Sequence, residues 1–413
     1  MESDEEKMGV YNFPIADKSE NIIKVIGIGG GGGNAVQHMW EEGVKNVTFF
    51  VVNTDSQALK PNRVPNKVML GDGLGAGGNP DKGRKCAEDS LEELRDVLGD
   101  ETKMVFITAG LGGGTGTGAT PVIAKMAKDM GILTVGVVTL PFMMEGKKRI
   151  DVALKGLEEL KKCVDSLIVV NNERLLADEQ YAQLNWEEGM KKADEVLTVA
   201  VKTIAEIITV RGLVNRDFND VNTVMRDGGA AIVSVAKASG ENRVFKAMSE
   251  AIHSSLIANF DIQNTKRLLY IIYSGTEYPA RMCELREINE FMESFDDYIQ
   301  VLWGHYPDEE LTDEIKVSIV ATGFDQEEEE QENVSQTERE RYVILRNKYY
   351  KKKEEEPEKP LEEEPVEAVE ESGEEDKDVK PVEKTDEGKG EDTGKKVSFF
   401  DKLISSLNKL LEE

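Results

Sequence analysis

Short apolar runs, separated by glycine-rich or polar turns, recur along the first half of the chain. Their length and β-branched content are typical of buried strands, and the segments between several of them have helical periodicity. The predicted strands are 22–27, 47–52, 67–70, 104–109, 132–139 and 166–170. Strands that alternate with helices in this way predict an α/β fold, a Rossmann-type parallel sheet with helices on both faces.

The pattern changes after residue 186, where apolar residues at helical spacing predict a long central helix over about 187–210. Further strands are predicted at 229–236, 267–274, 298–303 and 315–322, with helical segments near 241–258 and 281–293. We therefore expect a second, α+β domain with a mixed sheet. The predicted divisions are a polar extension (1–21), an α/β domain (22–186), the central helix (187–212), an α+β domain (213–324), a disordered acidic linker (325–396) and an amphipathic tail helix (397–413).

The linker and the tail have opposite character. Residues 325–394 hold 27 acidic and 12 basic side chains, a net of -15 out of -29 for the whole chain, which predicts disorder with at most a short helix in 339–353. The tail opens on a capping-box pattern, Ser398 to Asp401, and favours a helix that binds a partner protein. Binding to a membrane surface, or folding back onto the chain's own domain, are the alternatives. Its apolar stripe comprises Phe400, Leu403, Ile404, Leu407, Leu410 and Leu411.

Composition excludes several classes of function. With 413 residues, a formal net charge of -29 and a pI near 4.7, the chain is not expected to bind nucleic acid through a basic face or to be attracted directly to anionic lipid. Three cysteines, odd in number and far apart, favour a reducing, cytoplasmic compartment. The acidic start of the chain predicts no signal peptide, and no apolar run is long enough to predict a transmembrane segment.

Two glycine-rich segments follow predicted strands. Gly27–Asn34 precedes a helix that we expect to start at Ala35, and its glycines fit the dinucleotide pattern G-x-G-x-x-G, with Asp55 where a ribose-binding acid is expected. Gly112–Gly118 precedes a helix expected over Ala119–Met130. Backbone N–H groups and helix N-termini bind phosphate, and two such sites suit a longer chain of phosphates than one does. The Walker lysine pattern is absent, so the sequence predicts a nucleoside di- or triphosphate site of another kind, with NAD as the alternative.

In several motifs the chain resembles the FtsZ family, the bacterial tubulin homologues that act as cell-division GTPases. The run Gly112–Gly118 matches the tubulin/FtsZ signature, and further matches lie at Lys24–Ala35, Asn53–Asp55, Gly73–Pro80, Pro141–Arg149 and Asn215–Val221. The resemblance covers roughly residues 22–323. It implies a tubulin-like fold and a cytoplasmic GTPase that binds GTP/GDP with Mg²⁺. It also implies head-to-tail homopolymers in a mid-cell division ring at the inner face of the membrane, with adaptor or membrane-tether proteins bound to the tail.

The resemblance also implies roles for individual residues. The two glycine segments would hold the phosphates, Glu145 and Arg149 would reach the ribose and nearby phosphates, and Asn172 and Asp194 would recognise guanine. The nucleotide-binding residues it implies are Gly29, Gly30, Gly31, Gly32, Gly33, Asn34, Asn53, Asp55, Ala76, Gly77, Gly112, Gly113, Gly114, Thr115, Gly116, Thr117, Gly118, Glu145, Arg149, Asn172, Met190 and Asp194. By themselves, Glu145 and Arg149 fit a solvated ion pair equally well, and Asp194 an exposed helix acid.

A separate acidic loop is implied to complete catalysis. Asn215, Asp217 and Asp220 would enter the nucleotide site of the adjacent subunit, where the two carboxylates orient the attacking water. Mg²⁺ would be held mainly by phosphates and water rather than by protein ligands. The alternative interpretation of Asp217 and Asp220 is a turn with side-chain capping.

Some positions depart from the family pattern. Met190 stands near where many relatives have a phenylalanine that stacks on guanine, Asn171 where relatives often have proline, and the loop 71–73 is short. Two other functions stay open on the sequence alone. One is an NAD-dependent oxidoreductase, although none of the three histidines has a recognisable catalytic setting. The other is a nucleotide-binding relative that assembles but hydrolyses poorly.

Overall fold

The apolar runs form a single ten-stranded sheet with the strand order β3-β2-β1-β4-β5-β6-β7-β10-β8-β9. A computed structural model describes residues 21–99, 101–177, 184–209, 214, 216–252, 262–295, 298–324 and 345–350. The described residues belong to one compact unit within residues 1–351. The predicted N-terminal extension and tail helix, and nearly all of the linker, lie outside the described residues.

The first six strands are all parallel to their neighbours, as the alternating pattern predicts. Their burial is nearly continuous because helices cover both faces, which explains why they appear in the sequence as apolar runs rather than as alternating patterns. Each lies within one residue of the predicted bounds. The strands are β1 (Ile23–Ile28), β2 (Thr48–Asn53), β3 (Asn66–Met69), β4 (Met104–Gly110), β5 (Leu133–Leu140) and β6 (Ser166–Asn171).

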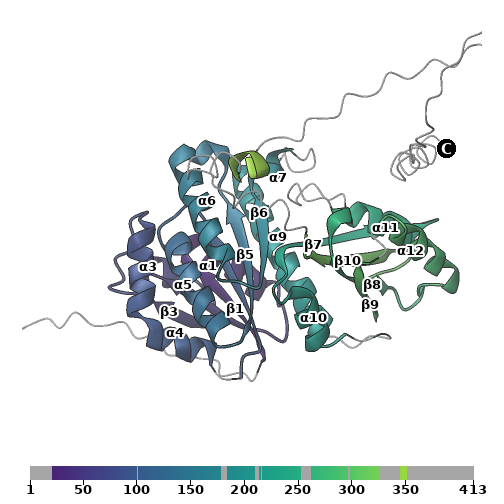
Figure 1. The fold of residues 1–413 in the computed structure, drawn as a ribbon, viewed down its shortest axis with the longest axis horizontal. Helices are drawn as coiled ribbons and strands as arrows, with labels where there is room; N and C mark the ends of the chain where they lie inside the picture. The colour runs from purple at the N-terminus through teal and green to yellow at the C-terminus, as the bar shows by residue number, and fades with distance from the viewer. Residues whose placement is uncertain are drawn as a thin grey trace, which may run out of the picture. The chain divides into compact units, whose positions relative to one another are not determined.

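Helices form a layer on each face of this parallel part (Figure 1). One layer packs on the face that carries Ile26 and Ile107, and the other on the face that carries Val25 and Phe106. The first layer consists of α3 (Pro80–Asp89), α4 (Leu91–Leu98), α5 (Thr115–Asp129) and α6 (Lys147–Lys161). The second consists of α1 (Gly29–Glu41), α9 (Trp186–Thr209) and α10 (Phe218–Met225). Two short helices, α2 (Ser56–Leu59) and α7 (Glu173–Ala177), and the 3-10 turn η1 (Met143–Glu145) follow strand ends.

The last four strands form the predicted mixed sheet. β10 (Ile315–Thr322) pairs antiparallel with both β7 (Gly229–Ala238) and β8 (Arg267–Ser274), whereas β8 and β9 (Gln300–Pro307) are parallel. The strand predicted at 298–303 therefore begins two residues later and continues to Pro307. Helices α11 (Arg243–Ile252) and α12 (Leu285–Met292) cover one face, and the turns η2 (Ile262–Asn264) and η3 (Met282–Glu284) complete this part.

The two predicted domains share one sheet, which the sequence does not reveal. Residues 166–168 of β6 pair in parallel with 229–231 of β7. The central helix α9 packs in the same core as β1, β5 and β8. Near the C-terminal end of α9, the Ile207 carbonyl accepts a hydrogen bond of 3.2 Å from the Tyr306 hydroxyl on β9. The α9 helix thus links the two parts as a buried element.

Two helix starts differ from the sequence predictions. The first glycine run was expected to form a loop as far as Asn34, but α1 begins at Gly29. The second helix was expected from Ala119, but α5 begins at Thr115. A β-carbon at Gly32 would lie 2.2 Å from the Thr108 carbonyl oxygen, so only glycine lets α1 approach β4 this closely. Tertiary packing overrides the low helix propensity of glycine at both starts.

Candidate functional site

Two helix N-termini meet at the carboxyl edge of the parallel strands. A β-carbon added to Gly29, at the start of α1, would lie 2.9 Å from the backbone nitrogen of Gly116, in the first turn of α5. Neither helix has a side-chain cap at its N-terminus. Gly30 and Gly31 are exposed, so N–H groups in the first turn of α1 face solvent. The arrangement concentrates two positive dipole ends on one point, as a chain of phosphates requires.

Side-chain hydroxyls hold the second glycine segment in shape. The Thr117 hydroxyl accepts a hydrogen bond from the Gly112 N–H at 2.8 Å and is buried, so it supports the loop from within. Thr115 shares a hydrogen bond of 2.6 Å with Thr54, a buried residue that sequence analysis passed over between Asn53 and Asp55. The two segments are therefore tied together as well as adjacent.

A third loop closes against these helices. Ala76 is buried, and a β-carbon at Gly114 would lie 2.7 Å from the Ala76 methyl group. Asp55 caps α2 by accepting from the Gln57 N–H at 2.8 Å, and Asn53 accepts from the Asp55 N–H at 3.2 Å. These two side chains therefore shape the loop after β2. The exposed Gly77 has φ 60°, in the left-handed region that favours glycine.

The loop after β5 brings Glu145 and Arg149 to the same edge. Glu145 accepts from the Phe142 N–H at 2.9 Å and pairs with the Arg149 guanidinium at 3.0 Å. The ion pair expected as an alternative is thus present. A β-carbon at Gly112 would lie 2.8 Å from Cγ of Arg149, so this side chain passes directly beside the second glycine segment. An arginine that already touches that segment is well placed to meet a phosphate.

Asn172 and Asp194 have unusual polar environments. Asn172 is buried, and its Oδ1 has no hydrogen-bond partner within the described part of the chain. Burial raises the pKa of Asp194 from 3.8 to about 7. Asn172 directly follows β6, and Asp194 lies in the first part of α9. An unpaired acceptor and a poorly solvated carboxylate suit a ligand rich in N–H donors.

The predicted catalytic acids lie elsewhere. The Asp217 side chain accepts from the Asp220 N–H, and the Asp220 side chain accepts from the Asp217 N–H, both at 3.0 Å. This capping box starts α10, so the capping interpretation is correct as a description of local structure. Asp220 also lies 3.6 Å from the Arg216 guanidinium. Asn215 lies outside the described residues, as does the Met190 side chain.

The α10 helix is anchored at the opposite edge of the sheet from the glycine segments. At its end, Arg226 donates to the Asp165 carboxylate at 3.1 Å and to the Gly131 carbonyl at 3.3 Å, both just before parallel strands begin. Figure 1 shows α7 and α10 toward opposite ends of α9. Strands of six to eight residues span roughly 20–26 Å. The C-terminal end of α10 therefore lies about a strand's length from the glycine segments.

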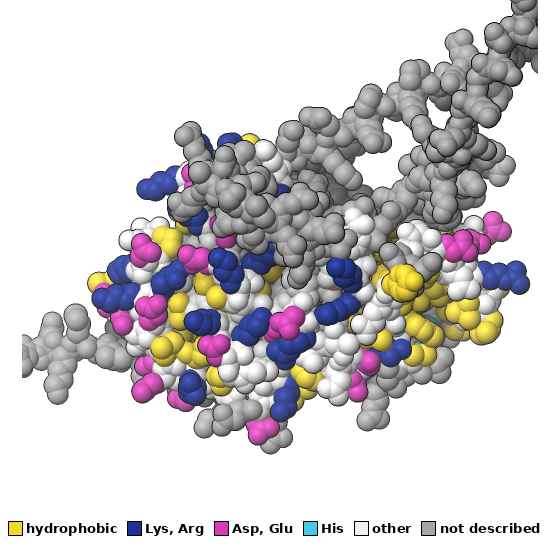
Figure 2. All heavy atoms as spheres, in the orientation of Figure 1, with side chains coloured by type: hydrophobic (Ala, Val, Ile, Leu, Met, Phe, Trp, Pro, Cys, Tyr) yellow, Lys and Arg dark blue, Asp and Glu magenta, His cyan; other side chains and the backbone are white. Residues whose placement is uncertain are grey.

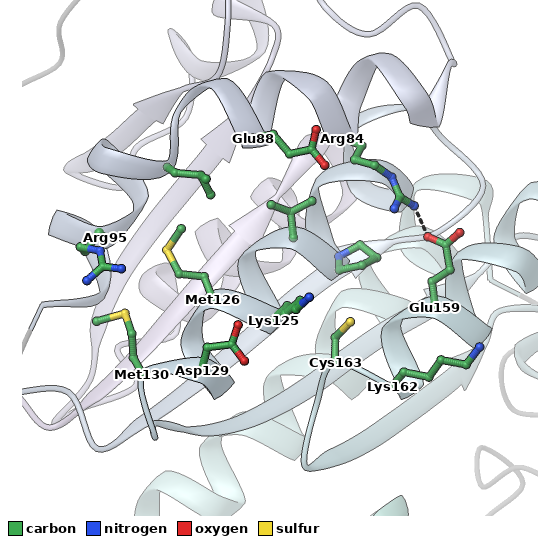
Figure 3. Close-up of a pocket in the computed structure, with 13 residues that line it drawn as sticks. Arg84, Glu88, Arg95, Lys125, Met126, Asp129, Met130, Glu159, Lys162 and Cys163 are labelled. Carbon is green, nitrogen blue, oxygen red and sulfur yellow. Dashed lines mark hydrogen bonds and ion pairs between the residues drawn. The ribbon is translucent and has the colours of Figure 1, made fainter.

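A separate groove of about 860 Å³ lies between α3, α4, α5 and α6, the helices of the first layer (Figure 3). Met126 and Met130 lie on one side of the groove. On another side, an ion pair between Arg84 and Glu159 connects α3 with α6. Basic and acidic side chains are interspersed over this layer (Figure 2). None of the predicted nucleotide-binding residues lines the groove.

The part of the chain that the structure describes contains no group of three or more His, Cys, Asp or Glu side chains suited to a metal ion. Among the described helices, none has the length and apolarity to cross a bilayer.

Family models match two segments of the chain. The Tubulin/FtsZ family GTPase domain matches residues 22–180, and the FtsZ family C-terminal domain matches residues 229–325. Together they cover the whole parallel part of the sheet and the mixed part. The GTPase domain thus corresponds to the parallel part of the sheet, and the FtsZ C-terminal domain to the mixed part.

Individual relatives agree with these models. A cell division protein FtsZ of Porphyromonas gingivalis is 47% identical over 322 residues, covering 76% of this chain and 70% of the relative. That of Wigglesworthia glossinidia brevipalpis is 45% identical over 316 residues, covering 75% and 81%. A solved structure described as an empty FtsZ dimer of M. jannaschii has 40% identity and a TM-score of 0.66, covering 73% of this chain and 88% of that one.

Proposed function

The chain belongs to the FtsZ family of cell-division GTPases, and we propose that its hydrolytic site is completed between two subunits joined head to tail. One observation carries the proposal: the uncapped helix N-termini lie at one edge of the sheet, and α10, whose first turn carries the acids, is anchored at the opposite edge. Groups so far apart in one subunit act together only if the acids of a second subunit face the phosphates of the first. Repetition of that contact produces a filament.

In the proposed complex the N-termini of α1 and α5 bind the phosphates, with Thr115 and Arg149 at their sides. Glu145 orients Arg149 and the ribose. Asn172 and Asp194 bind the guanine, whose N1–H and 2-amino group are donors that match a carboxylate. Adenine has no such pair of donors on that edge, so the same groups select for guanine.

Asp217 and Asp220 of the second subunit would orient water at the γ-phosphate. Each cap uses only part of a carboxylate's acceptor capacity, so both acids retain lone pairs for a water molecule. The water oxygen bonds to phosphorus as the bond to the β-phosphate oxygen breaks, and the proton passes to a carboxylate or a phosphate oxygen. Mg²⁺, held by phosphates and water, would supply charge neutralisation there. Asn215 would help to position the water.

The filament would form the scaffold of the division ring at mid-cell. We propose that the 397–413 tail attaches it to adaptor or membrane-tether proteins at the inner face of the membrane. The support is the apolar stripe of the tail sequence beyond a long acidic linker.

A mixing experiment tests the shared site. The first variant, D217N/D220N, removes both charges but keeps oxygens that accept the capping hydrogen bonds. The second, Gly30→Glu, places a negative charge at the α1 N-terminus, where a β-carbon meets no atom within 4 Å. The first should bind GTP without hydrolysing it, and the second should not bind GTP.

An equimolar mixture should recover turnover, because loops from Gly30→Glu subunits meet GTP held by D217N/D220N subunits. Turnover of wild-type protein should also rise more steeply than linearly with concentration. A mixture no more active than its components, together with turnover per subunit that is independent of concentration, would show a self-contained site.

A further inference from the structure

A short segment beyond the last strand returns to the edge of the sheet that carries the nucleotide loops. Residues 345–350 are helical and follow β10 by more than twenty residues. Tyr349 is 8% exposed and belongs to the core beneath α5 and α6, with Leu345 and Tyr350 packed against that core. Figure 1 shows this yellow-green segment near α6 and α7, apart from β10. We name residues 345–350 the strap.

Two hydrogen bonds fix the strap to strand ends. The Asn171 side-chain amide donates to the Tyr349 carbonyl at 2.5 Å. The Tyr350 hydroxyl donates to the Pro141 carbonyl at 2.8 Å. Asn171 is the last residue of β6, and Pro141 directly follows β5. The strap therefore bridges the two strands from which the ribose and guanine loops emerge.

Hydrogen bonds link the strap, through Asn171, to the loops that carry the proposed nucleotide-binding residues. Asn171 precedes Asn172 in the chain, and its Oδ1 also accepts from the Glu173 N–H at 3.0 Å. Glu173 in turn accepts from the Met143 N–H at 2.8 Å, which ties the loop after β6 to the loop after β5. Asn171 faces the strap through its bond to Tyr349, and Asn172 is its neighbour in the chain. Immobilising Asn171 thus fixes the backbone that aims Asn172.

The hydrogen bond to the Tyr349 carbonyl depends on the asparagine side chain at residue 171, because a residue without a side-chain amide, such as proline, could not donate it. Tyr350 gives the strap a second, independent contact, its hydrogen bond to the Pro141 carbonyl. Leu345, Tyr349 and Tyr350 are the apolar and aromatic side chains of the strap, which lies within a largely acidic linker.

We propose that the strap is a positioning element of the nucleotide site, which slows nucleotide dissociation by holding the loops after β5 and β6. The inference rests on the proposed function, because it requires those loops to bind ribose and guanine. In the proposed site these loops hold the ribose and the base, so releasing the strap loosens both contacts and accelerates departure. The strap touches no substrate and acts through Pro141 and Asn171.

Dissociation of a fluorescent GDP analogue from the full chain tests the proposal. Tyr350→Phe deletes one hydroxyl and should raise the dissociation rate about threefold, and Tyr349→Ala, which also removes a buried ring, about tenfold or more. Asn347→Ala, an exposed position on the same turn, is the matched control and should match wild type. In turnover assays the strap variants should raise KM for GTP with little change in kcat.

The outcomes separate the two proposals. Equal dissociation rates for wild type, Tyr350→Phe and Asn347→Ala would overturn the strap while leaving the nucleotide site intact. If wild type itself fails to retain GDP, the proposed function fails first. If Tyr349→Ala does not fold, the single-hydroxyl variant decides, because loss of one hydroxyl preserves the packing of the ring.

Discussion

Replacing Asp194 with asparagine tests whether this carboxylate reads the base. Burial holds its pKa near 7 rather than 3.8, a difference of about three units. At about 1.4 kcal/mol per unit, keeping this group ionised in the nucleotide-free protein costs up to about 4 kcal/mol. Donors from guanine would offset that cost by solvating the carboxylate, so its pKa should fall when nucleotide binds.

The linkage between protonation and binding fixes the sign of the pH effect. Guanine requires the ionised form, whereas the empty site takes up a proton as pH falls through 7. Affinity for GDP should thus be about tenfold weaker at pH 6 than at pH 8 in wild type. In Asp194→Asn this component should vanish. The nucleotide phosphates titrate equally with both proteins, so the difference between the two pH profiles isolates Asp194.

The variant should also change base preference. The asparagine side chain offers one acceptor and one donor, so its amide N–H groups oppose the 2-amino group of guanine. We expect GDP to bind about 30-fold to 1,000-fold more weakly, from a loss of about 2–4 kcal/mol. Xanthine has a carbonyl in place of that amine, and XDP should bind the variant better than GDP does.

Titration calorimetry with GDP and XDP at pH 6 and 8 gives all four affinities. Stability provides a second measurement. In wild type the native state binds the Asp194 proton more tightly than the unfolded state, so this group lowers stability as pH rises from about 4 to 7. Nucleotide-free Asp194→Asn should therefore unfold at a higher temperature than wild type at pH 8, but not at pH 4. A GDP preference and a pH profile both unchanged in the variant would refute the role of Asp194 in base recognition.

Three further predictions concern the helix starts and the core. Asp220→Asn and Asp220→Ala should both lower GTP turnover at saturating protein by about 100-fold. Only the alanine variant loses the capping hydrogen bond, so only it should lose about 1 kcal/mol of stability in urea unfolding. Equal stability losses would contradict the capping argument. Gly32→Ala should destabilise the protein by several kcal/mol because its methyl group would lie 2.2 Å from a β4 carbonyl oxygen, whereas Gly30→Ala, with open space around it, should leave the thermal midpoint nearly unchanged. Arg226→Met should cost about 1–3 kcal/mol because the buried Asp165 carboxylate loses a charged donor, and an unchanged urea midpoint would refute that assignment.

Much of the fold was predictable because it depends on local patterns. A strand buried on both faces must be continuously apolar, and turns at its ends need glycine or polar residues, so strand positions were predicted closely. The central helix, predicted over about 187–210 and assigned to 187–212 in the division of the chain, is observed at Trp186–Thr209. Family motifs such as Gly112–Gly118 can also be recognised directly in the sequence, and the matching GTPase-domain model covers that segment.

Other features depend on residues distant in sequence. Glycine runs favour loops by propensity, yet contact with β4 makes Gly29–Gly33 helical. The pairing of β6 with β7 joins the two predicted domains through only three residues on each strand.

The sequence by itself determined which segments become strands and helices and where the glycine segments lie, because periodicity and glycine content follow directly from the order of residues. Only the tertiary structure decided that α10 is anchored across the sheet from the glycine segments, that Asp194 becomes partly buried with a raised pKa, and that the Tyr349 carbonyl accepts from Asn171. Each of these depends on the packing of distant elements, and local sequence does not encode the distance between them.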